Sequence, residues 1–180
     1  MKLRLFVALD LPEAARAALA AFRAAAADPA IWRPVPDEAL HLTLAFLGHR
    51  PEEDVDAIAR VLQAAPATAP RLALGPALGL PPRRPRVLTA EVEDRDGTLA
   101  ELQAVVSREL AARGLYEPEA RAYRPHATVA RLRPGARAGR GELPGPERLE
   151  FHGAALTLYE SRLRRDGARY APLARVPLAR

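Results

Sequence analysis

A seven-residue pattern occurs twice in the chain, once in each half. The first copy runs from His41 to Leu47 and the second from His126 to Leu132, and four of the seven positions are identical. Both copies contain a His-x-Thr triplet within an apolar stretch, which is typical of a half-buried β-strand. The fold must therefore hold two similar motif strands, as expected of a duplicated unit or of two segments that serve one chemical purpose.

Each triplet places an imidazole beside a hydroxyl on one face of its strand. Because side chains alternate along a strand, His41 shares a face with Thr43, and His126 shares a face with Thr128. If the two halves pack about an approximate two-fold axis, these pairs face each other across a cleft. Such a cleft suits phosphoryl transfer, because one imidazole can accept a proton from the nucleophile while the other protonates the leaving oxygen. The hydroxyls and Arg131 can stabilise the phosphate charge, so this chemistry requires no metal.

Other kinds of site find little support in the sequence. A single motif is also compatible with a histidine and a threonine that satisfy each other or the backbone, but the matched pair favours a shared site. His49 and His152 lack a paired motif and are interpreted as polar strand-end residues. Ser107 and Ser161 are the only serines, and neither lies in a Gly-x-Ser-x-Gly turn. The chain has no cysteine, no zinc-type histidine cluster and no phosphate-binding P-loop sequence.

Charge and composition permit an anionic partner without requiring one. The 180-residue chain has a formal charge of +5, and nearly all of its basic residues are arginines, which suit phosphate and can stack on bases. A coding bias or selection for heat resistance explains the same excess. No apolar run is long enough to cross a membrane, and Leu3–Leu9 is too short for a signal peptide. We therefore expect a cytoplasmic protein, and a monomer.

The order of apolar and turn-forming segments predicts an α+β fold with mainly antiparallel sheets. A proline-rich connector from Trp32 to Asp37 is expected to include a short strand, and a turn is expected at 164–167. Helices are predicted from Pro12 to about Ala27, from Pro51 onward, and from Gly97 to Arg113. Strands are predicted at Leu3–Leu9, Leu40–Gly48, Arg71–Leu80, Arg86–Val92, Pro125–Leu132, Leu149–Tyr159 and about Arg169–Leu178.

Four segments together resemble the bacterial and archaeal 2′-5′ RNA ligase family, which is also called RNA 2′,3′-cyclic phosphodiesterase and belongs to the two-histidine phosphoesterases. They are Leu5–Leu9, Trp32 with Leu40–Gly48, Tyr123–Arg131 and Leu156–Ser161. Tyr123 stands where the family often has phenylalanine, and Ala127 is smaller than the usual aliphatic residue. Neither difference affects the groups that would carry the chemistry.

The resemblance implies a bilobal fold, residues 1–180 forming one domain of two lobes with two sheets and flanking helices related by a pseudo-two-fold axis. It implies hydrolysis of a terminal 2′,3′-cyclic phosphate on RNA to a 2′-phosphate, without cofactor or metal. Small nucleoside 2′,3′-cyclic phosphates are further possible substrates. By the same resemblance His41 is the proton donor and His126 the proton acceptor, while Thr43, Thr128 and Arg131 hold the phosphate.

Two alternatives to hydrolysis stay open at this point. One is a different enzymatic duty within the superfamily, either RNA-end trimming or joining of tRNA halves through a 2′-5′ bond; joining would use the same residues, with an RNA 5′-hydroxyl in place of water. An RNA-binding module without turnover would not need both His-x-Thr triplets. The arginine-bearing loop Arg133–Gly145 either lies along an RNA backbone or is a solvated connector, and we favour the connector.

Overall fold

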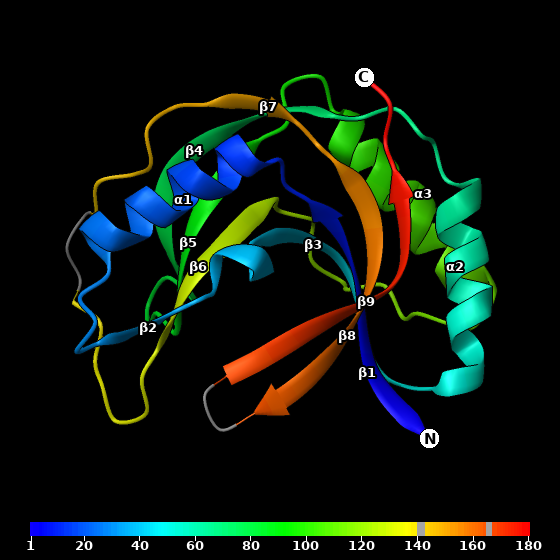
Figure 1. Cartoon of the computed structure of the whole chain (residues 1–180), viewed down its shortest axis with the longest axis horizontal. Helices are drawn as coiled ribbons and strands as arrows, with labels where there is room; N and C mark the ends of the chain where they lie inside the picture. The colour runs from blue at the N-terminus through cyan, green and yellow to red at the C-terminus, as the bar shows by residue number, and fades with distance from the viewer. Residues whose placement is uncertain (140–142, 165–166) are drawn as a thin grey trace.

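The structure of the chain is a computed structural model, and it describes residues 1–139, 143–164 and 167–180 (Figure 1). Its strands are β1 (Lys2–Asp10), β2 (Trp32–Pro34), β3 (His41–Pro51), β4 (Arg71–Leu80), β5 (Val87–Glu93), β6 (His126–Leu132), β7 (Glu150–His152), β8 (Ala155–Arg164) and β9 (Gly167–Pro177). Its helices are α1 (Glu13–Ala26), α2 (Val55–Ala64) and α3 (Thr98–Ala112), with short 3₁₀ turns at Asp37–Ala39 and Glu52–Asp54. The α+β class predicted from the sequence is confirmed.

The strands form one curled sheet with the order β7-β4-β5-β6-β3-β1-β8-β9, and β2 pairs with the other part of β6. All pairings between the named strands are antiparallel. The two motif strands β3 and β6 are neighbours at the middle, where the paired residues are Leu42 and Ala127. The two predicted sheets are thus two halves of one sheet, joined by a narrow contact. This junction brings the two motifs together.

Helices cover the outer side of each half of the sheet, away from the junction of β3 and β6. Helix α1 packs against β6 and its half, whereas α2 and α3 pack against β8, β9 and β3 (Figure 1). Pro12 precedes α1, as the sequence predicts for a first helical turn. Asp96 accepts a hydrogen bond from the Thr98 amide at the start of α3, and Gly114 adopts a positive φ of 67° just after its end. Within the described residues, no helix is both long enough and apolar enough to span a bilayer.

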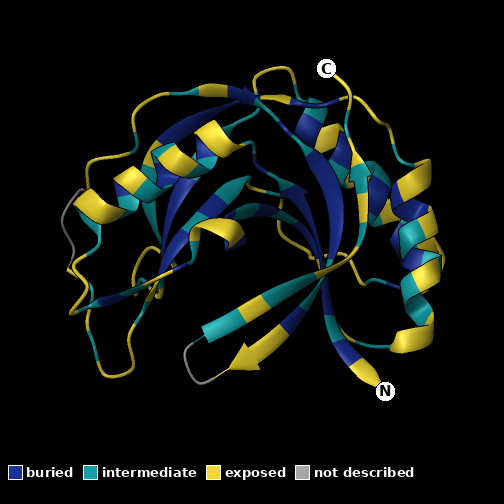
Figure 2. Cartoon of the chain, viewed as in Figure 1, coloured by how far each residue is buried: buried dark blue, intermediate teal, exposed yellow. Residues whose placement is uncertain are grey.

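The apolar core fills the space between the sheet and the helices. On β1, Leu5, Val7 and Leu9 are completely buried and belong to the core cluster that also contains the helix residues Leu19 and Ile58, whereas Phe6 and Ala8 do not belong to it. Figure 2 shows the same division over the whole fold, with buried strands inside and exposed outer faces on the helices. The alternate residues of β1 are therefore free to face the opposite side of the sheet, where the two motifs lie.

Two boundaries differ from the sequence prediction. The stretch Leu149–Tyr159 is not one strand, because Gly153 and Ala154 separate β7 from β8. A Cβ atom at Gly153 would lie 2.8 Å from a Leu9 methyl carbon, so any larger residue there would force the Leu9 side chain to move. Pro51 ends β3 rather than starting a helix, and α2 begins after the following 3₁₀ turn. Residues 165–166 of the predicted turn, and 140–142 of the Arg133–Gly145 loop, lie outside the described residues.

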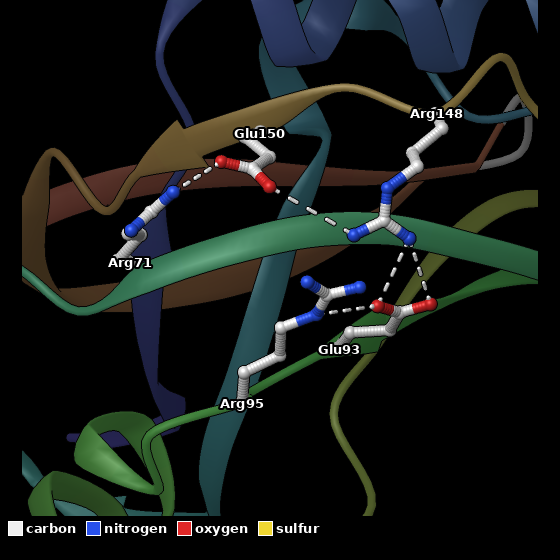
Figure 3. A network of polar contacts seen from close by, with 5 residues as sticks. All are labelled: Arg71, Glu93, Arg95, Arg148 and Glu150. Carbon is white, nitrogen blue, oxygen red and sulfur yellow. Dashed lines mark hydrogen bonds and ion pairs between the residues drawn. The ribbon is translucent and has the colours of Figure 1, made fainter.

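Five charged side chains tie the short edge strand β7 to its neighbours on the outer surface (Figure 3). Glu150 accepts a hydrogen bond from Arg71 at 2.6 Å, and Glu93 accepts hydrogen bonds from Arg148 and Arg95 at 3.1 and 3.3 Å. Networks of this kind suit heat-resistant proteins better than isolated surface pairs do. At least part of the arginine excess is therefore engaged in structural ion pairs.

Candidate active site

All five residues proposed from the sequence line one small pocket at the junction of β3 and β6. The pocket has a volume of about 40 Å³ and is lined by Phe6, Val35, Ala39, His41, Thr43, Phe46, His126, Thr128, Arg131 and Tyr170. The motif strands supply the two His-Thr pairs, and strand alternation turns these pairs away from the helix-covered core. A wider hollow of about 580 Å³ beside Trp32 is lined by no histidine or threonine, so it lacks the groups that this chemistry needs.

Both catalytic candidates are oriented by the same backbone contact. The Nδ1 atom of His41 lies 2.7 Å from the carbonyl oxygen of Ala39, and that of His126 lies 2.8 Å from the carbonyl oxygen of Arg124. A carbonyl only accepts, so each Nδ1 carries hydrogen and each neutral ring has its free lone pair on Nε2. The His41 Nε2 atom lies 3.1 Å from the Thr43 hydroxyl. On each neutral ring Nε2 is therefore the nitrogen that can accept a proton, and on His41 it lies beside the Thr43 hydroxyl.

Aromatic rings pack around His41 and fix its plane. The Phe6 ring lies beside it with centroids 5.0 Å apart, and the Tyr170 ring meets it edge-on at 5.4 Å. Phe6 also stacks on Phe46, over which the Arg4 guanidinium lies 4.9 Å from the ring centroid. These rings give the pocket one apolar wall, contributed by β1, β3 and β9.

Burial dominates the electrostatics of His41. It lowers the pKa of His41 from 6.5 to about 4, and the positive charge of Arg131 and the neighbouring His126 act in the same direction. The hydrogen bond to Ala39 and the charge of Asp10 oppose this shift. In the absence of substrate, His41 is therefore neutral at neutral pH.

Asp10 is held behind His41 by three donors. It is the register partner of His41 between β1 and β3. Its carboxylate accepts hydrogen bonds from Tyr159 at 2.8 Å, Thr157 at 2.9 Å and Arg175 at 3.0 Å. These bonds fix one negative charge close to the imidazole and leave it unable to turn into the pocket.

A β-bulge follows each His-x-Thr triplet. On β6, Thr128 pairs with Thr89 and Ala130 with Leu88, so Val129 is the extra residue. Strict alternation would turn Arg131 away from His126, because the two are five residues apart. The bulge shifts the phase by one residue and returns Arg131 to the pocket. On β3 the first extra residue is Leu44, which returns Phe46 to the pocket in the same way, and a second extra residue, Leu47, follows Phe46.

Sequence reasoning missed the pocket residues outside the two motifs. Phe6 lies on β1 and Tyr170 on β9, and the pairing of these strands with β3 and β8 is not visible in a single sequence. The one available signal was strand alternation along β1, which places its even-numbered residues, including Phe6, on the face opposite the core. His49 and His152 lie near strand ends, outside the pocket, as predicted. Within the described residues, no three histidine or carboxylate side chains form a metal-binding group.

Comparison with known proteins identifies relatives over almost the whole chain. The sequence profile described as the 2′-5′ RNA ligase superfamily matches residues 11–165. A Thermus thermophilus protein named RNA 2′,3′-cyclic phosphodiesterase is 36% identical, over 98% of this chain and 90% of its own. An Escherichia coli protein of the same name is 32% identical, over 96% of this chain and 94% of its own. The crystal structure of E. coli LigT complexed with 3′-AMP has a TM-score of 0.84 at 30% identity, with full coverage of both chains.

Proposed function

The chain belongs to the 2′-5′ RNA ligase superfamily, and we propose that it hydrolyses terminal 2′,3′-cyclic phosphates on RNA to 2′-phosphates. The observation that carries this proposal is the pocket itself. His41 and His126 both line it with Nδ1 held by a backbone carbonyl, which leaves Nε2 for proton transfer, and Thr43, Thr128 and Arg131 line the same space. Two proton-transfer groups beside hydroxyl and guanidinium donors suit in-line displacement at phosphorus.

The proposed reaction breaks one bond to phosphorus and forms another. His126 takes a proton from water as the water oxygen attacks phosphorus, and the P–O3′ bond breaks on the opposite side. His41 delivers its proton to O3′, which leaves as a free 3′-hydroxyl beside the new 2′-phosphate. Thr43, Thr128 and Arg131 hydrogen-bond the non-bridging oxygens, on which negative charge accumulates.

Because the pKa of His41 is low, the ring can become protonated near neutral pH only when the bound substrate raises that pKa. An anion within about 4–6 Å raises the pKa of a histidine by about 1–3 units. A cyclic phosphate seated against His41 would bring a pKa of about 4 to a range in which the imidazolium is populated near neutral pH. The charge of Asp10 already contributes to the value of about 4, so the further increase comes from the phosphate. His41 would thus become an acid only in the substrate complex.

The relatives support both the reaction and the substrate class. Two of them are named RNA 2′,3′-cyclic phosphodiesterase, and E. coli LigT was crystallised with the mononucleotide 3′-AMP. We extend the proposal to small nucleoside 2′,3′-cyclic phosphates as secondary substrates. We further propose one domain over 1–180 with two pseudo-symmetric lobes, acting as a cytoplasmic monomer. The joined halves of the sheet, with one motif each, support that division.

The test is incubation with an RNA that ends in a 2′,3′-cyclic phosphate, followed by determination of the product's phosphate position. We expect addition of one water and a 2′-phosphate end, and loss of turnover in both His41→Ala and His126→Ala. A 3′-phosphate product would contradict the assigned direction. Absence of any product from the folded wild-type protein would refute the function.

Joining of RNA ends is the second candidate, because the superfamily description names a 2′-5′ RNA ligase. An RNA 5′-hydroxyl would replace water as the nucleophile, and the same histidines would serve. Addition of a second RNA with a free 5′-hydroxyl to the same incubation separates the two outcomes. A joined product that increases at the expense of the 2′-phosphate would favour ligation.

A further inference from the structure

Arg33 on β2 lies beside Arg131 on the pocket side of the sheet. The two residues are register partners between β2 and β6, and directly opposed residues of an antiparallel pair project from the same face. The preceding residue, Trp32, is 6% exposed and lies on the opposite, core side. Because Arg131 lines the pocket, Arg33 extends the same surface by one strand.

Nothing in the described part of the chain neutralises this pair of arginines. Other arginines near the pocket do have partners: Arg23 contacts Asp37, and Arg124 contacts Glu91. Within the described residues, neither member of the Arg33 and Arg131 pair forms a hydrogen bond or an ion pair. Like charges on directly opposed strand positions repel each other, and an anionic ligand would relieve that repulsion.

The Arg33 side chain reaches toward the β8–β9 hairpin, which projects from the body of the protein (Figure 1). Its guanidinium carbon lies 3.7 Å from the position that a Cβ atom of Gly167 would occupy. Gly167 starts β9, and Tyr170, three residues further along, lines the pocket. Three residues of a strand span about 10 Å. Arg33 is not among the residues that line the pocket, so its guanidinium lies beside the pocket, near the Gly167 end of β9.

We propose that Arg33 binds a backbone phosphate upstream of the cyclic phosphate and so makes the enzyme favour RNA strands over mononucleotides. This inference rests on the proposed function. The planar guanidinium suits a phosphate diester. Because Arg33 lies on the β-strand next to that of Arg131, it would hold the RNA in line with its terminal cyclic phosphate. Base identity plays no part in such a contact, so the preference is for length and not for sequence.

The test compares Arg33→Ala with wild type on a length series that ends in the same 2′,3′-cyclic phosphate nucleotide. The series runs from the mononucleotide through dinucleotide and trinucleotide to a hexanucleotide. Arg60→Ala is the matched control, because it removes an exposed arginine from α2 at no cost to the pocket. Arg33→Lys keeps the charge but loses the planar fork.

For Arg33→Ala we expect an unchanged rate on the mononucleotide and a KM raised roughly tenfold or more on the longer strands. The slope of log KM against log salt for the hexanucleotide should fall by about 0.7, the value for one phosphate contact on a single strand. Arg33→Lys should retain most of the salt slope. Arg60→Ala should match wild type on every substrate.

Equal losses on the mononucleotide and the hexanucleotide would overturn the inference, because Arg33 would then act at the terminal phosphate. Unchanged kinetics on all lengths would overturn it as well. Either result leaves the proposed function intact, since the wild type still hydrolyses cyclic phosphates. Failure of the wild type to hydrolyse any member of the series would instead refute the proposed function, and with it the assignment of Arg33.

Discussion

Replacement of His41 by glutamine should make the protein less sensitive to acid unfolding. The pKa of His41 is about 4 in the folded protein and 6.5 as its ordinary value. Between these values the unfolded chain binds a proton that the folded protein does not. The neutral ring therefore contributes its full stability above about pH 6.5, and that contribution is lost as the pH falls toward 4.

The size of the effect follows from the two pKa values. Relative to the variant, the wild type should lose about 2 kcal/mol of unfolding free energy between neutral pH and pH 5. The loss should reach about 3 kcal/mol at pH 4. Burial of the ring is its main cause, since the hydrogen bond to Ala39 and the charge of Asp10 both act against the shift.

Urea unfolding at a series of pH values measures the difference directly, because other titrating groups cancel between the two proteins when they do not interact with His41. His49→Gln is the matched control, which removes an exposed histidine from the same strand. Its pH profile should parallel that of the wild type. Parallel profiles for wild type and His41→Gln would refute the reasoning and would mean that water reaches the ring.

Three further results are expected. Activity should survive EDTA, because both proton transfers and charge stabilisation come from side chains; loss on chelation that a divalent ion restores would favour a metallohydrolase. Arg131→Ala should lower kcat by roughly ten- to a thousandfold, as removal of a charge-stabilising donor does, and a wild-type rate would show that the guanidinium does not reach the phosphate. On an activated aryl phosphodiester, which needs no acid, His41→Ala should recover much of its activity whereas His126→Ala should stay slow. Recovery of His126→Ala instead would exchange the two roles.

The motif strands could be predicted from the sequence because their signal is local. An apolar stretch interrupted at alternate positions by His41 and Thr43 specifies a strand and also the face on which the two polar groups lie. The repeat at His126 then suggested a shared pocket. Helices were predicted for the same reason, with errors confined to boundaries such as Pro51, where a strand and a helix compete for the same residues.

The rest of the pocket depends on strand pairing, which a single sequence does not reveal. Asp10 approaches His41 only because β1 pairs with β3, and Tyr170 reaches the ring only because β9 folds back beside β8. Arg33 belongs to the short strand expected between Trp32 and Asp37, but the pairing of that strand with β6, which places Arg33 opposite Arg131, is not visible in the sequence. The break between β7 and β8 includes Gly153, which packs closely against Leu9 in the folded protein, and no local propensity encodes such an approach.

Equivalent bulges on the two motif strands explain how a nearly symmetric site can have a direction. Each triplet is followed by one extra residue, so the side chain five positions after each histidine returns to the pocket. On β3 that position holds Phe46, an uncharged ring, whereas on β6 it holds the cation Arg131. The histidines alone would accept a cyclic phosphate in either orientation. In the proposed mechanism, a cation at one end and an aromatic wall at the other favour a single placement of phosphate and ribose, which lets one imidazole act as the acid and the other as the base.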